Sequence, residues 1–202
     1  MVSIESLVLE VPDPSSAEAF YVDAFDLGDR VHVRASDAPS TGFRGFTLSL
    51  VVAQPSTVDL LVAGALDAGA TELKPVKKSL WGYGGVVQAP DGTICTLAAS
   101  SKKDTGVADR KIDDVVLQLG VEDVKTSKQF YADQGLTVAK SFGRKYVEFD
   151  MPGAPVTLTL LGRSALAKTA GVSPDGTGSH RLTIRSQAGA FIDPDGFTWE
   201  AA

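Results

Sequence analysis

The sequence contains few of the residues from which disulfides and metal sites are built. Among 202 residues there is one cysteine, Cys95, and there are two histidines, His32 and His180. A single thiol excludes an intramolecular disulfide, which is compatible with a reducing cytosol.

Positive charge and long apolar runs are also scarce. Lysine and arginine number 19 against 25 aspartates and glutamates, which gives a net charge of -6 and a pI near 4.9. This balance argues against a nucleic-acid partner, because affinity for a polyanion rests on a basic surface. No stretch approaches the roughly 18 apolar residues that a membrane-spanning helix needs, and the N-terminus has no basic leader. We therefore expect a soluble cytoplasmic protein with no membrane partner.

What the sequence does contain is an internal repeat. Residues 193–200 read Asp-Pro-Asp-Gly-Phe-Thr-Trp-Glu, and residues 89–96 read Ala-Pro-Asp-Gly-Thr-Ile-Cys-Thr. Asp-Gly between two apolar runs predicts a hairpin turn that joins two strands. The eighth position of each copy, Thr96 or Glu200, then lies on the second strand of its hairpin. The chain is therefore interpreted as a duplicated unit.

The rest of the sequence supports two halves, residues 1–100 and 112–202, with a polar linker at 101–111. In the first half the patterns predict strands at 4–11, 30–34 and 43–53 and helices at 13–28 and 55–69. In the second half they predict strands at 112–119, 145–149, 156–161 and 181–185 and helices at 122–135 and 164–170. Each half lacks an element that the other keeps. A strand without its covering helix needs another partner for its apolar face, so we expect the halves to pack into one body.

Two motifs give the chain a family resemblance. Each half has an opening strand and a capped helix that carries a Phe-Tyr pair, Phe20-Tyr21 or Phe130-Tyr131, and each ends in an Asp-Gly hairpin. In this the chain resembles the vicinal oxygen chelate superfamily, which includes glyoxalases, bleomycin-resistance proteins and extradiol dioxygenases. The resemblance implies an α+β fold of paired βαβββ modules, with curved mixed sheets that form a cup and helices outside. It implies no particular reaction, because one fold hosts many.

The resemblance also implies where metal ligands would stand. In the first half those positions hold residues that are not normal ligands of a divalent metal: Ser6, Gly45 and Thr96. In the second half they hold Asp114, Arg181 and Glu200. Arginine has no lone pair to give. We therefore expect no metal cofactor, and an ion triad of Asp114, Arg181 and Glu200 in the place of the metal.

An alternative depends on the register of one strand. A slip of one residue turns a strand over, and it would put His180 in place of Arg181. Asp114, His180 and Glu200 would then make a site for a divalent metal such as zinc, nickel or iron. The arginine register is favoured because His180 shares the face of Leu182, which should point to the core. The sequence leaves both registers open.

Three further residues are candidate ligand-binding positions. Tyr146 and Glu148 alternate along a strand and either line the cup or face solvent. Trp81 stands in the stretch Leu-Trp-Gly-Tyr-Gly-Gly at 80–85, which is either a flexible lid over a pocket or a tight path around a buried ring.

Three functions follow as hypotheses. The favoured one is a glyoxalase-like protein that has no complete metal site and that binds a small, partly apolar molecule, or performs acid–base chemistry on it with Asp114 and Glu200. The alternatives are a metal-dependent lyase, isomerase or dioxygenase, and a non-catalytic interaction protein. Whether the chain is an enzyme stays open at this point, and it could be a monomer or a homodimer.

Overall fold

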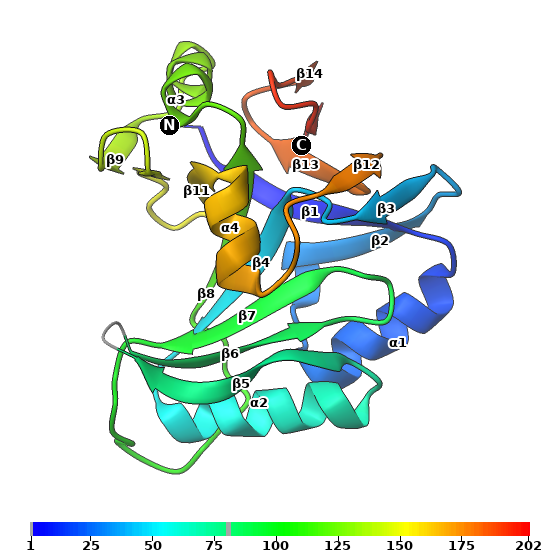
Figure 1. Cartoon of the computed structure of the whole chain (residues 1–202), viewed down its shortest axis with the longest axis vertical. Coiled ribbons are helices and arrows are strands. Elements are labelled where there is room, and N and C mark those ends of the chain that lie inside the picture. Colours follow the sequence, from blue (N-terminus) through cyan, green and yellow to red (C-terminus); the bar gives the residue numbers. More distant parts are fainter. Residues whose placement is uncertain (1, 80–81) are drawn as a thin grey trace.

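The computed structural model describes residues 2–79 and 82–202 and contains helices and strands in about the order that the sequence predicts (Figure 1). The elements of the first half are β1 (Ile4–Val11), α1 (Pro14–Ala24), a short 3-10 helix (Gly28–Arg30), β2 (Val31–Ala35), β3 (Ser40–Gly42), β4 (Phe46–Val52), α2 (Pro55–Asp67), β5 (Thr71–Ser79), β6 (Gly82–Gln88) and β7 (Ile94–Ala99). The elements of the second half are β8 (Asp114–Val121), α3 (Val124–Asp133), β9 (Val138–Ser141), β10 (Tyr146–Phe149), β11 (Thr157–Gly162), α4 (Arg163–Ala170), β12 (Gly176–Gly178), β13 (Leu182–Ser186), β14 (Phe191–Ile192) and β15 (Thr198–Ala201).

Both large sheets are built from the two halves together. The eight-stranded sheet has the order β5-β6-β7-β4-β8-β11-β10-β9, and the two halves meet where β4 pairs antiparallel with β8. The five-stranded sheet has the order β14-β15-β13-β1-β2, and the halves meet where β1 pairs antiparallel with β13. The smallest sheet pairs β3 with β12, again one strand from each half. This is the predicted α+β fold with large mixed sheets.

The predicted hairpins are present at both copies of the repeat. β6 pairs antiparallel with β7, and β14 with β15. Gly92 and Gly196 in the two turns have φ values of 92° and 89°, a left-handed conformation that a side chain would strain. The aspartate-glycine pairs therefore mark the same local structure in each half.

The main core lies between the sheets and helices α1, α2 and α3. Along β8 the residues Val115, Leu117 and Leu119 are fully buried, whereas the alternate residues Asp114 and Val116 are half-buried on the opposite face. The apolar set belongs to one continuous cluster with the opening strand β1 and helices α1, α2 and α3. The opposite face of the eight-stranded sheet is therefore the one left for a ligand.

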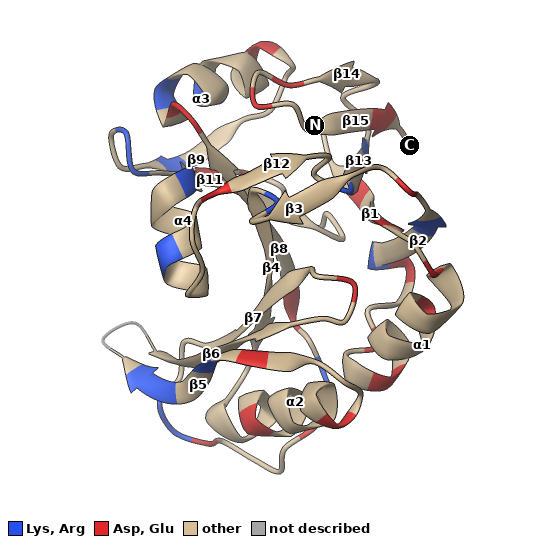
Figure 2. Ribbon diagram, turned by 45° about the vertical axis from the view of Figure 1, so that its right-hand side comes forward, with Lys and Arg blue, Asp and Glu red and all other residues tan. Residues whose placement is uncertain are grey.

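Helix α4 departs from the predicted arrangement, in which all helices lie outside the cup. The eight-stranded sheet curves into a C shape, and α4 lies in its opening (Figures 1 and 2). Its apolar residues Leu166, Ala167 and Ala170 pack into a second cluster with Phe43, Val86 and Ile94. Because these side chains need an apolar partner and the outer face is already covered, the short helix fills one end of the concave face.

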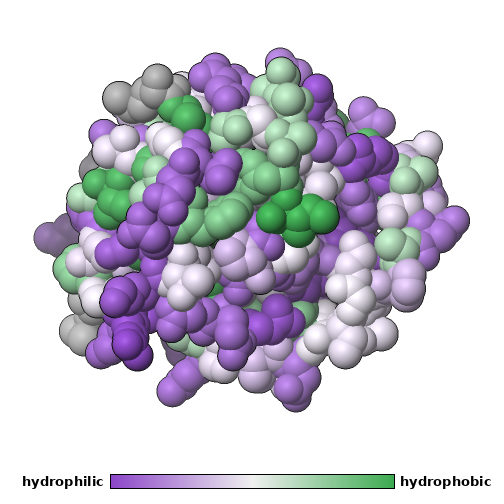
Figure 3. Space-filling model, turned by 90° about the horizontal axis from the view of Figure 1, so that it is seen from above, coloured by the Kyte–Doolittle hydropathy of each residue, from purple (hydrophilic) through white to green (hydrophobic). Residues whose placement is uncertain are grey.

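The surface has no dominant apolar region in the part of the chain that the structure describes. The exposed large hydrophobic residues are Val22, Leu60, Leu66, Val107, Phe142 and Ile192. On the face seen in Figure 3, hydrophobic groups stand between hydrophilic ones. Single exposed apolar side chains of this kind are ordinary for a protein surface.

Among the described helices, none is both long enough and apolar enough to cross a membrane.

Candidate functional site

The concave face of the eight-stranded sheet contains a hollow over its second-half strands. Its volume is about 340 Å³. The residues that line it come from β8 to β11 and the turn after β10: Asp114, Val116, Ala139, Tyr146, Glu148, Phe149, Asp150, Met151, Pro152, Thr157 and Thr159. Asp114, Tyr146 and Glu148, which the sequence singles out, are thus brought together here. We call this cavity the β8–β11 hollow.

One wall of the hollow is a chain of polar side chains on β9 and β10. The hydroxyl of Tyr146 donates to Glu148 Oε2 at 3.1 Å, and Lys140 Nζ donates to both carboxylate oxygens of Glu148 at 3.0 and 3.2 Å. Burial, with the Glu148 carboxylate adding to it, raises the pKa of Tyr146 to about 12. Tyr146 therefore stays a neutral hydroxyl that can take part in hydrogen bonds at physiological pH.

Asp114 stands at the start of β8 on the floor of the hollow. Partial burial raises the pKa of its carboxyl group above the usual value, and hydrogen bonds from the Val115 N–H and the Thr157 side chain oppose that shift. Arg30 also lowers the pKa, while Glu148 raises it. The net result is a carboxyl group that carries its negative charge less readily than one in water.

Thr159 is a polar residue of the hollow that was not predicted from the sequence. It lies on β11 with 3% of its surface exposed, and its hydroxyl has no hydrogen-bond partner among the described residues. A buried polar group left without a partner costs about 1–3 kcal/mol. The signal was present in the sequence, because Thr157 and Thr159 alternate with leucines along a predicted strand.

A second hollow of about 470 Å³ lies over the first-half strands of the same sheet. Ser49 of β4, Thr96 of β7 and Gln118 of β8 contribute to its floor. Thr96, which occupies a position implied for a metal ligand, therefore faces a hollow with neutral polar neighbours. Both hollows reach β8, because Gln118 lines this one and Asp114 and Val116 line the β8–β11 hollow.

The predicted ion triad of Asp114, Arg181 and Glu200 is wrong. Asp114 belongs to the eight-stranded sheet, whereas Glu200 lies on β15 of the five-stranded sheet, because β13 and β15 assemble on β1 and not on β8. Arg181 precedes β13 with a φ of 52°, and its guanidinium donates to the carbonyl oxygen of Ala38 at 3.1 and 2.7 Å. The Arg181 side chain therefore binds the loop that contains Ala38.

A guanidinium between two carboxylates does exist in the molecule, but other residues form it. Arg34 on β2 donates to Glu10 at 2.8 Å and to Glu200 at 3.1 Å. Thr183 completes the group by accepting from Arg34 and donating to Glu10. The predicted type of cluster is thus found on the exposed face of the five-stranded sheet, away from Asp114.

The alternative metal site of Asp114, His180 and Glu200 is also wrong. The ring nitrogens of His180 face the carbonyl oxygens of Arg44 and Asp195, and its ring stacks on Phe197 with 3.9 Å between centroids. Each ring nitrogen therefore faces a backbone carbonyl oxygen and not Asp114 or Glu200. Within residues 2–79 and 82–202, no three side chains of His, Cys, Asp or Glu lie close enough together to hold a metal ion. The donor set that the fold's metal-using members suggest does not fit these positions.

Trp81, the remaining candidate, lies outside the described residues, so its placement is not assigned.

The sheet order and the hollow define the class of fold: the chain has the vicinal oxygen chelate fold, with modules paired across β4–β8 and β1–β13. Glyoxalase I from Zea mays aligns with 98% of this chain and 91% of its own length, with a TM-score of 0.63 and 14% identity. A putative dioxygenase from Bacillus subtilis aligns with 96% of this chain and 71% of its own length, with a TM-score of 0.57 and 12% identity.

At such identities the likeness establishes the fold alone, and it confirms the resemblance drawn from the Phe-Tyr pairs and the Asp-Gly turns. The sequence itself matches no family model and no curated protein.

Proposed function

We propose that the protein binds a small, partly apolar molecule in the β8–β11 hollow. The observation that carries this proposal is the hydroxyl of Thr159, which is buried without a partner at the wall of a cavity of about 340 Å³. A ligand that donates to this oxygen or accepts from it would offset the cost of burying the group. Ligand sites in proteins are commonly concave, largely apolar, and oriented by a few polar groups of this kind.

The lining defines the character of the ligand. Val116, Ala139 and Met151 offer apolar contact, while Asp114 and Thr159 stand on neighbouring parallel strands. Because Thr159 pairs with Gln118, four residues along β8 from Asp114, the ligand should have an apolar body with a polar group for each of these two side chains. A hydroxyl, amide or amine suits the Asp114 end, because each can donate to the carboxyl group.

A second function, proton transfer to a bound substrate, is favoured by one observation. Partial burial raises the pKa of Asp114, and a carboxyl group shifted toward neutrality is better suited to act as a general acid or base. In this version Asp114 acts alone, because Glu200 lies on the other sheet. The binding proposal does not depend on it.

The test is a thermal-shift screen of small, partly apolar molecules, followed by titration of each hit against variants. A ligand that binds the folded state alone raises the melting temperature by mass action. For a true ligand of the hollow, Thr159→Val should weaken binding by about tenfold, since one hydrogen bond is worth roughly 1 kcal/mol or slightly more. Asp114→Asn should change the affinity for hits that carry an amine.

The matched control is Thr198→Val, which makes the same chemical change at an exposed position on β15. It should leave the affinity unchanged. Hits whose affinity responds equally to both substitutions, or no hit from a broad panel, would reject the proposal and favour a non-catalytic interaction protein.

A further inference from the structure

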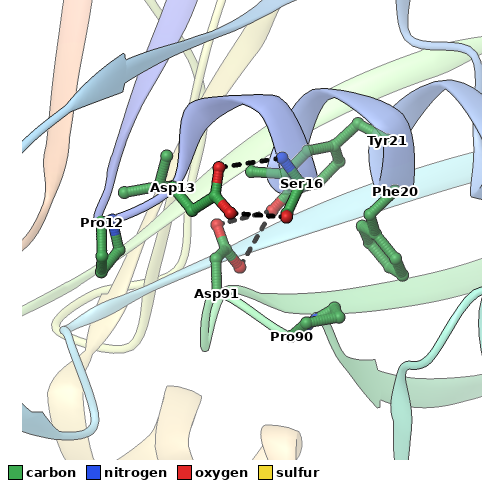
Figure 4. Close-up of a pocket in the computed structure, with 9 residues that line it drawn as sticks. Pro12, Asp13, Ser16, Phe20, Tyr21, Pro90 and Asp91 are labelled. Carbon is green, nitrogen blue, oxygen red and sulfur yellow. Dashed lines mark hydrogen bonds between the residues drawn. The ribbon is translucent and has the colours of Figure 1, made fainter.

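A separate cavity of about 200 Å³ lies between the first turns of α1 and the turn that joins β6 to β7. Its lining residues are Val11, Pro12, Asp13, Ser16, Ala17, Phe20, Tyr21, Pro90 and Asp91. Figure 4 shows Asp13 and Ser16 on the helix, with Pro90 and Asp91 on the opposite side. We call it the α1 pocket. It lies apart from the β8–β11 hollow and shares no lining residue with it.

The second half of the internal repeat contains an equivalent turn and helix start, and there the two are in direct contact. In the second half, Asp195 of the equivalent turn binds directly to the start of α3. Its carboxylate accepts from the Glu122 N–H at 2.7 Å and from the Ser127 hydroxyl at 2.6 Å. Two donors on either side of the helix start therefore hold this turn against the helix.

The first half has lost both donors. The position of Glu122 is taken by Pro12, which has no N–H, and the position of Ser127 is taken by Ala17, which has no hydroxyl. The carboxylate of Asp91 accordingly accepts from Thr93 within its own turn and from the Tyr21 hydroxyl at 3.1 and 3.2 Å. These two residue differences leave the turn untied from the start of α1, at the place where the pocket lies.

The walls of the pocket are apolar and its rim is acidic. Phe20, Pro90 and Val11 supply ring and aliphatic surfaces, and Asp13 stands at the rim as the N-cap of α1. Hydrogen bonds from Ser16 lower the pKa of the exposed Asp13 carboxyl group, so it is ionised at neutral pH. Helices α1 and α2 contain acidic residues and no lysine or arginine, as the red segments of Figure 2 show.

Asp13 is better placed than Asp91 to receive a cation. Each oxygen of Asp13 accepts one hydrogen bond from Ser16, which leaves further lone pairs available. Each carboxylate oxygen of Asp91 already accepts two hydrogen bonds. The backbone oxygen of Asp91 accepts from Arg44, whose positively charged guanidinium offsets the negative charge of the Asp91 carboxylate.

We propose that the α1 pocket is a second binding site, for a single small ring that carries a primary ammonium group. The ring lies against Phe20 and Pro90, and the ammonium group binds the Asp13 carboxylate. The volume suits one ring with a short chain, because an apolar cavity of about 150 Å³ holds benzene. An ammonium group that binds an ionised carboxylate gains a charge-assisted hydrogen bond.

The experiment is a titration of the full chain with benzylamine, followed by ¹⁵N–¹H correlation spectra, with benzyl alcohol as the uncharged analogue. We expect saturable shifts at the amides of Ser16, Ala17 and Asp91 with a dissociation constant on the order of 1 mM. Benzyl alcohol should bind at the same amides several-fold more weakly.

Two variants distinguish binding in the α1 pocket from nonspecific binding at the protein surface. Asp13→Asn keeps an N-cap, since asparagine caps helices as well as aspartate does, and it should weaken benzylamine several-fold without changing benzyl alcohol. Pro12→Glu combined with Ala17→Ser restores both donors of the second half and should weaken both probes at least tenfold. Ser127→Ala, in the second half, is the matched control and should change neither.

The proposal is overturned if no saturable shifts occur at these amides with benzylamine up to about 10 mM, or if the Asp13 and Pro12/Ala17 variants bind both probes as the unchanged protein does. Since the β8–β11 hollow shares no residue with this pocket, either result leaves the proposed function to its own test.

Discussion

Thr159 links the stability of the protein to its proposed function at the scale of one residue. Its hydroxyl is buried without a partner among the described residues, so it costs the folded state free energy while it offers a ligand a hydrogen bond. Such groups are few in native proteins, and each one calls for an explanation. The same side chain should therefore show opposite effects in stability and in affinity.

Replacing Thr159 with valine removes the hydroxyl and keeps the branched shape. We expect the free energy of unfolding to rise by about 1 kcal/mol, because an unsatisfied buried group is lost. Urea denaturation of the ligand-free protein measures this change in the free energy of unfolding. Thr198→Val at an exposed position should change stability by less than about 0.5 kcal/mol. A loss of stability in Thr159→Val would show that the hydroxyl is satisfied in solution.

Asp114 gives a prediction about pH. Its pKa in the folded protein is raised, chiefly by burial, so the folded state favours the protonated form. Its contribution to stability is therefore fully present below the ordinary pKa of 3.8 and is lost as the pH rises through the folded-state pKa. Carbon-13 NMR of the Asp114 carboxyl group should give a midpoint above 3.8. Thr157→Val should move this midpoint higher still, since Thr157 lowers the pKa; a midpoint at or below 3.8 would contradict the environment described here.

At this scale the sequence predicted some of the site and misplaced the rest. Tyr146 and Glu148 follow from strand alternation, which determines which side chains share a face. The positions of Arg181 and Glu200 depend instead on which strand pairs with which. That choice is made by contacts between distant segments, here β13 and β15 with β1, and local alternation carries no information about it.

At the scale of elements, helix α4 depends on a side chain from the other half. Lys74 on β5 donates to the carbonyl oxygens of Lys168 and Thr169, both at 2.6 Å, at the end of the helix. The last carbonyl groups of a helix have no partner within it, and a cation there also interacts favourably with the helix dipole. Lys74 thus connects β5 to the end of α4 across the concave face of the eight-stranded sheet.

We expect Lys74→Met to loosen α4 without unfolding the sheet. Methionine keeps much of the aliphatic stem and removes the ammonium group. Hydrogen exchange at the backbone amides of α4 should accelerate about fivefold, which corresponds to about 1 kcal/mol. Lys78→Met, at an exposed position on the same strand, is the control. Equal exchange of α4 in both variants would mean that Lys74 does not hold the helix.

Two of the strands that the sequence failed to predict, β5 and β9, share a physical cause. β5 contains Pro75 and three lysines, and β9 has four residues, so neither has a clear apolar alternation. Both are edge strands of the eight-stranded sheet. An edge strand tolerates proline and charge because one side needs no hydrogen-bond partner. These residues interrupt the apolar alternation from which strands are predicted.

At the scale of the whole molecule, the two halves share every sheet. The central pairs β4–β8 and β1–β13 each join one half to the other. The sequence indicated this interdependence, since each half was missing an element, and it identified the fold from the repeated Phe-Tyr pair and Asp-Gly turn. The exchange of strands between sheets could not be anticipated, because it needs the three-dimensional order of the modules.

Cutting the chain within residues 101–111 tests this interdependence. The segment lies outside the helices and strands of the structure, so a protease site placed there should be cleaved without separating the pieces. We expect the two fragments to elute together in size-exclusion chromatography under native conditions. Isolated, each fragment should lose cooperative unfolding, because it keeps two exposed sheet edges. Two fragments that separate and fold alone would contradict the shared sheets.

The most direct test of the proposed function is to map one confirmed small-molecule hit by ¹⁵N–¹H chemical-shift perturbation on the full chain. We predict that the largest shifts fall at the amides of Val116, Tyr146 and Thr159 around the β8–β11 hollow, and that they become weaker in Thr159→Val. Shifts confined to the five-stranded sheet around Arg34 and Glu200, or spread without saturation over the surface, would contradict it.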